Sequence, residues 1–149
     1  KSSVTGTSYS VTMKSTVDGR QIYCVVTDKY GNTFVDSISN LGGKAEFIID
    51  APEKGDYRVT LTYANNAEGG VHSYNVDLIE RYATFTVNGE SQDVYCRNTF
   101  SRYNFKTVTF TLSLEKGDNA VSITNSGSYL FNGMTAYAPQ IASLTVNGK

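Results

Sequence analysis

The sequence predicts an all-β fold, an antiparallel β-sandwich with jelly-roll topology. Several short stretches alternate apolar and polar side chains with a period of two, which is typical of strands with one buried face. Sequences that favour turns separate these stretches at the intervals of a sandwich. No long stretch combines the helical period of about 3.6 residues with capping residues at both ends. All three observations favour a fold built from strands.

Four stretches alternate most clearly, and each predicts a strand with one face in the core. In chain order, the expected core positions are Tyr57, Val59, Leu61 and Tyr63; Ala83, Phe85 and Val87; Val108, Phe110, Leu112 and Leu114; and Val121 and Ile123. Turns are expected at 52–55, 88–89, 115–118 and 126–127, where Pro, Gly, Asn, Asp and Ser gather.

Two longer stretches, residues 65–74 and 126–139, break the alternation. Each predicts a long loop rather than a strand. Binding residues on rigid β-scaffolds lie disproportionately on such loops, so functional residues are expected there first.

The composition favours one secreted domain. A chain of 149 residues with 40% hydrophobic residues can bury one good core, so we expect a single domain over residues 1–149. The 13 Lys and Arg residues nearly balance the 14 Asp and Glu residues, which argues against nucleic acid as a partner. Apolar runs are far shorter than the about 20 residues that cross a bilayer, which argues against a membrane. The 11 tyrosines and 13 glycines are typical of secreted β-rich modules.

The two cysteines, Cys24 and Cys96, leave two alternatives open. They form a disulfide if their strands adjoin and bring the Cα atoms within about 7 Å. Otherwise both are buried thiols that pack as small apolar side chains.

Candidates for catalysis are few. The single histidine, His72, lies in a Gly-rich stretch with no nucleophile motif around it. Carboxylates are present, but a glycosidase pair is defined by its spacing in three dimensions. Residue spacings of the common zinc and calcium motifs are absent. The sequence therefore favours a binding or structural protein over an enzyme.

Aromatic and planar polar side chains gather in or near the expected loops. They are Tyr74, Arg81, Tyr82, Arg97, Asn98, Tyr103, Phe105, Tyr129, Phe131, Asn132 and Tyr137. A sugar offers an apolar C–H face and a rim of hydroxyls, which such a mixture suits. The alternative is that several aromatics cap the ends of the sandwich as core, namely Tyr95, Phe100, Tyr129 and Phe131. Arg97 could equally be a structural arginine that bonds loop carbonyls.

A series of colinear motifs resembles family 35 carbohydrate-binding modules, which are related to family 6. The motifs include LTYAN at 61–65, VNG at 87–89, FKTVTF at 105–110, LEKGDN at 114–119 and YAPQI at 137–141. No single motif is specific, but their order and spacing match the family over roughly residues 9–147.

The resemblance implies a non-catalytic jelly-roll module that binds sugar in the loops at one end of the sandwich. It also implies a catalytic glycoside hydrolase or polysaccharide lyase domain in the same parent chain, secreted or on the bacterial cell surface, and we expect the module to be a monomer. The candidate carbohydrate-binding residues are Asn65, His72, Tyr74, Arg81, Asn98, Tyr103, Tyr137 and Gln140. Tyr103 lies in the segment where many family members carry a tryptophan platform.

Two departures from the family pattern bear on function. Carboxylates that hold a structural calcium in many members are replaced in residues 9–13 and 140–142, so we expect that calcium to be lost. The chain has no tryptophan, which leaves tyrosine as the stacking residue. An alternative is therefore a structural spacer or protein-interaction domain that keeps the sandwich but has lost sugar binding.

Overall fold

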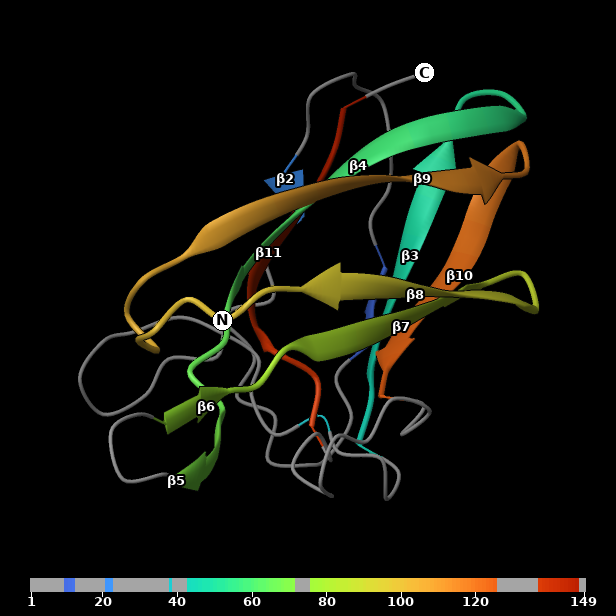
Figure 1. Ribbon diagram of the computed structural model, residues 1–149. Coiled ribbons are helices and arrows are strands. Elements are labelled where there is room, and N and C mark those ends of the chain that lie inside the picture. Colours follow the sequence, from blue (N-terminus) through green and yellow to red (C-terminus); the bar gives the residue numbers. More distant parts are fainter. Residues whose placement is uncertain are drawn as a thin grey trace.

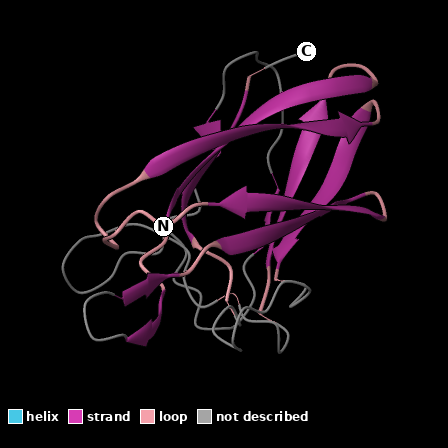
Figure 2. Cartoon of the chain, in the orientation of Figure 1, coloured by secondary structure: helices cyan, strands magenta, loops and turns pink. Residues whose placement is uncertain are grey.

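A computed structural model describes residues 10–12, 21–22, 38, 43–71, 76–125 and 137–147. Within these ranges every regular element is a strand, which confirms the all-β prediction (Figure 2). The strands are β1 (Ser10–Thr12), β2 (Gln21–Ile22), β3 (Ala45–Ala51), β4 (Gly55–Ala64), β5 (Glu68–Val71), β6 (Val76–Leu78), β7 (Arg81–Val87), β8 (Glu90–Cys96), β9 (Lys106–Leu114), β10 (Gly117–Thr124) and β11 (Gln140–Val146). The described part of the chain holds no helix long and apolar enough to cross a membrane.

Two sheets form the predicted sandwich (Figure 1). One has the order β1-β3-β10-β7-β8 and the other β2-β11-β4-β9. All neighbours pair antiparallel except β1 and β3, which run parallel. In these two strand orders, β8 and β9 each stand last, so they are edge strands of different sheets. Strands β5 and β6 form a separate antiparallel pair, so residues 68–71, expected to lie in a long loop, form a strand instead. Of the other expected loop, residues 126–136 lie outside the described residues.

The core lies between the two sheets and contains the residues that the alternation predicts. Val59, Leu61 and Phe85 are fully buried, because each points inward from the middle of a strand. Phe110 and Val108 face the same core but are only partly buried. Their strand, β9, is an edge strand, so no further strand covers their outer flank. The Phe110 ring still packs on Phe85, with 4.7 Å between the ring centroids.

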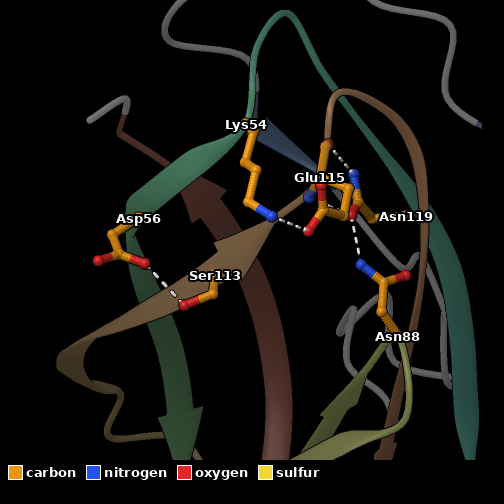
Figure 3. Close-up of polar contacts among 6 residues, drawn as sticks. All are labelled: Lys54, Asp56, Asn88, Ser113, Glu115 and Asn119. Atoms are coloured by element: carbon orange, nitrogen blue, oxygen red, sulfur yellow. Dashed lines mark hydrogen bonds and ion pairs between the residues drawn. The ribbon is translucent and has the colours of Figure 1, made fainter.

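Polar side chains close the end of the sandwich that carries the short turns (Figure 3). The amide of buried Asn119 donates to the Glu115 and Gly117 carbonyls at 2.8 and 2.7 Å and accepts from Asn88 at 2.6 Å. Asn88 and Gly89 have φ of 52° and 91°, the left-handed pair that a tight hairpin favours. An ion pair of 2.6 Å joins Lys54 to Glu115. The hydrogen-bonding groups of these turns are thus engaged with one another, and the loop of residues 97–105 lies at the other end of the sandwich (Figure 1).

Candidate functional site

Asn65 ties three segments together beneath the loop end of the sandwich. Its side-chain amide donates to the carbonyls of Ile79 and Cys96, at 2.9 and 3.1 Å, and accepts from the Ala67 N–H at 3.1 Å. Its backbone pairs with that of Thr99, whose N–H donates to the Asn65 carbonyl at 2.7 Å. The residue has 0% of its surface exposed, and every polar atom of its side chain is used.

Asn98 has a similar position on the neighbouring segment. Its side-chain amide donates to the Ala67 carbonyl at 2.7 Å, and its side-chain oxygen accepts from the Phe100 N–H at 2.7 Å. Only 4% of its surface is exposed. The expectation that Asn65 and Asn98 face the sugar does not fit this burial, because their amides already hold carbonyls and N–H groups of the loops. They form a frame under the site rather than its rim.

Aromatic side chains stand out of this frame on the loop between β8 and β9, residues 97–105. Phe100 is 69% exposed and Tyr103 is 65% exposed, and Phe105 follows them. The structure therefore contradicts the alternative that Phe100 caps the core. Phe100 has φ of 64°, a conformation uncommon for a bulky residue. The bond from its N–H to Asn98 holds it there.

The same loop is fixed at several further points. The Asn104 amide donates to the Thr99 carbonyl at 3.0 Å, and the Thr99 hydroxyl donates to the Ser101 carbonyl at 2.9 Å. Lys106 donates to the Asn98 carbonyl at 3.1 Å and lies 5.8 Å from the centre of the Phe100 ring. The exposed rings thus stand on a loop whose backbone is hydrogen-bonded from within and from below. We call Phe100, Tyr103 and Phe105 the aromatic platform.

Arg81 lies at the loop end of the core. It is half-buried at the start of β7, and its guanidinium donates to the Ala138 carbonyl at 3.3 Å. The same group lies 5.9 Å from the centre of the exposed Tyr137 ring. Arg81 therefore links β7 to the segment before β11 and makes a cation–π contact with Tyr137. Arg97, the residue considered as a structural arginine, is exposed instead.

Other predicted residues fall in different places. Gln140 is 5% exposed at the start of β11, so it lies below the surface. His72 and Tyr74 lie outside the described residues, as do Tyr129 and Phe131 of the core-capping alternative. Tyr95, also expected there to be core, is 44% exposed on β8.

Cys96 is a buried free thiol in this frame. Burial raises the pKa of the thiol to about 12, and the neighbouring carboxylate Glu80 adds to the shift. The buried-thiol alternative therefore describes Cys96, while Cys24 lies outside the described residues.

Neither Phe100 nor Thr99 was among the residues predicted to bind sugar. Thr99 is fully buried with its hydroxyl shared between the Asn65 backbone and Ser101. The available signal was the run Asn98-Thr-Phe, two groups that bond backbone followed by an aromatic. Within the described residues, no three side chains of His, Cys, Asp or Glu gather in a way that would hold a metal ion.

Comparison with solved structures shows which class of protein shares this sandwich. A family 35 carbohydrate-binding module from Clostridium thermocellum is 24% identical with a TM-score of 0.61, and the match covers 88% of this chain and 90% of that one. A second family 35 module, solved in complex with a disaccharide that contains glucuronic acid, is 25% identical with a TM-score of 0.57, over 91% and 87% of the two chains. The fold is thus that of family 35 carbohydrate-binding modules, as the motifs predict.

An enzyme also contains this fold as one part. The exo-β-1,3-galactanase of Phanerochaete chrysosporium, solved with β-1,3-galactotriose, is 22% identical with a TM-score of 0.58. The match covers 86% of this chain but 26% of that one. The sequence matches no protein-family profile and no curated protein.

Proposed function

We propose that this chain is a non-catalytic carbohydrate-binding module that holds a sugar on the aromatic platform of residues 97–105. The observation that carries the proposal is the exposure of Phe100 and Tyr103 on a loop fixed by the buried side chains of Asn65 and Asn98. Exposure of apolar rings to water is unfavourable, so a cluster of exposed rings indicates a binding surface. A loop that is already ordered loses little conformational entropy when a ligand binds. Such rings supply the apolar face that stacks on a pyranose.

Polar partners for the sugar hydroxyls surround the platform. Arg102 lies 5.8 Å from the centre of the Tyr103 ring, and Lys106 lies beside Phe100. The phenol of exposed Tyr137, whose ring lies beside the Arg81 guanidinium, is a further candidate partner. Two cations at the platform favour a ligand rich in oxygen atoms, including an acidic sugar.

The wider setting follows from the same proposal. Residues 1–149 act as one monomeric module, attached to a catalytic glycoside hydrolase or polysaccharide lyase domain that is secreted or displayed on the bacterial cell surface. The likeness to modules studied as sugar binders, and to one part of a galactanase, supports this setting. The module anchors the enzyme to its polysaccharide and performs no chemistry itself.

Titration calorimetry tests the proposal with β-1,3-galactotriose and a disaccharide containing glucuronic acid, the ligands of two structural neighbours. Replacement Tyr103→Ala should weaken binding by about 1–2 kcal/mol, roughly tenfold, because the stacking face is lost. The exposed residue Lys116, in the turn at the other end of the sandwich, provides the control Lys116→Ala. If the wild-type chain binds neither these two saccharides nor any glycan of a broad array, the spacer alternative is favoured.

A further inference from the structure

A groove runs along the side of the sandwich between the edge strands β8 and β9. Its volume is about 440 Å³, within the range of small-molecule sites. Tyr63, Val108 and Phe110 are among the residues that line it from the core side. Asp93 and Tyr95 of β8 line the other side, together with Arg97, the first residue after that strand. None of these groove residues except Arg97 was considered for sugar contact, and none belongs to the aromatic platform.

The lining combines an apolar floor with polar and aromatic groups at the rim. Tyr95 is 44% exposed, and its ring packs on Tyr82 with 5.1 Å between the centroids, so the ring is held while one side stays open. Tyr63 is buried at the groove floor, and burial raises the pKa of its phenol. Arg97 adds a charged donor, and the carboxylate of Asp93 accepts a hydrogen bond of 2.5 Å from the Thr84 hydroxyl on β7. This mixture matches the apolar face and hydroxyl rim of a pyranose.

The edge of β9 supplies backbone groups as well. The Thr111 carbonyl accepts a hydrogen bond of 2.7 Å from the side chain of Gln92 on β8, so this carbonyl points away from β4 and toward the groove. Alternate residues of an edge strand present their N–H and C=O groups to the same side. Thr109 and Thr107 therefore also present backbone donors and acceptors to the groove.

The groove has a closed end and an end that leads to the platform. The bond from Gln92 to Thr111 bridges the two edges at the closed end. At the other end, β8 finishes at Cys96 and β9 begins at Lys106, and the loop between them is the one that carries Phe100 and Tyr103 (Figure 1). The same bridge interrupts the free edge of β9, which disfavours an added peptide strand as the occupant.

We propose that the groove between β8 and β9 binds the sugar residues that continue from the one held on the aromatic platform, so that the module binds an internal stretch of a linear glycan chain. This inference rests on the proposed function, because the platform holds the first part of the same ligand. The ligand class is a linear chain of pyranoses, and its length rather than its terminal sugar determines affinity.

Calorimetry with matched di- and hexasaccharides of β-1,4-xylan, β-1,4-mannan and β-1,3-galactan tests the groove. For the series that binds, the hexasaccharide should bind at least about tenfold more tightly than the disaccharide, since each added contact contributes. Tyr95→Ala should remove most of that gain and leave the disaccharide affinity unchanged. Glu90→Ala, on the same strand but outside the lining, should leave both affinities unchanged.

Backbone NMR shifts provide a readout that needs no variant. The amides of Thr107 and Thr109 should shift with the hexasaccharide and stay in place with the disaccharide. Equal affinities for the two lengths, with Tyr103→Ala weakening both, would overturn the groove while leaving the platform intact. Failure of every saccharide to bind would overturn both, and loss of disaccharide binding in Tyr95→Ala alone would make the groove the primary site and overturn the platform.

Discussion

At the scale of single residues, buried asparagines determine where the loops lie. The family resemblance placed Asn65 among the candidate sugar contacts, at the start of the loop that follows Ala64. Its burial depends on carbonyls of Ile79 and Cys96, which are distant in the chain. Local patterns could not reveal those partners. The same holds for Asn98, which bonds the Ala67 carbonyl.

Replacement of Asn65 by alanine should destabilise the fold by about 2–4 kcal/mol, because buried carbonyls and an N–H lose their partner at once. Urea denaturation followed by circular dichroism measures the change. The exposed neighbour Asn66 provides a matched control, since Asn66→Ala removes the same group from solvent-accessible surface. Equal midpoints for the two variants would contradict the frame.

The Cys96 thiol links stability to pH. Its pKa is raised from 9.0 to about 12 in the folded state, so the folded chain holds this proton over a range where the unfolded chain releases it. Its contribution is fully present below pH 9 and declines as pH rises from about 9 towards 12. In a Cys24→Ser variant, a thiol reagent at pH 8 should label Cys96 only at the rate of unfolding. Rapid labelling of the native chain would refute this burial.

At the scale of elements, alternation predicted the inward faces of β4, β7, β9 and β10 correctly. Burial of one strand face leaves a period of two in the local sequence, so this information is available without a structure. Strand order is not local. The partial exposure of Phe110 follows from the position of β9 at the edge of its sheet, and no nearby residue signals that position.

Edge position should reduce the cost of a cavity at Phe110. We expect Phe110→Ala to destabilise by about 2–3 kcal/mol and Phe85→Ala by about 3–5 kcal/mol, because the outer site can relax towards solvent. Chemical denaturation of both variants checks the order. As a control, Thr109→Ala at the exposed neighbouring position should leave the free energy of unfolding near that of the wild type. A larger loss for Phe110→Ala than for Phe85→Ala would contradict the assignment of β9 as a partly open edge.

At the scale of the whole molecule, the two ends of the sandwich differ in kind. At one end, Asn119 and its neighbours satisfy the turns internally, while at the other the buried frame leaves aromatic rings in solvent. The resemblance in sequence motifs predicted the fold. Its candidate sugar contacts combined the buried Asn65 and Asn98 with the exposed Tyr103, because burial depends on partners that are distant in the chain.

Calcium provides a prediction for the whole fold. Because the carboxylates that would hold it are replaced in residues 9–13 and 140–142, folding should need no calcium. Adding a chelator should leave the melting temperature unchanged, since an ion bound only to the native state would otherwise raise stability by mass action. A fall of many degrees, restored by added calcium, would show that other oxygen ligands hold the ion.

In the proposed complex a sugar rests on Phe100 and Tyr103. The most direct measurement is the set of intermolecular NOEs between bound sugar protons and assigned side-chain protons, in a complex with the glycan selected by an array. We expect NOEs from sugar C–H protons to the rings of both residues. NOEs confined to other residues, with none to either ring, would contradict it.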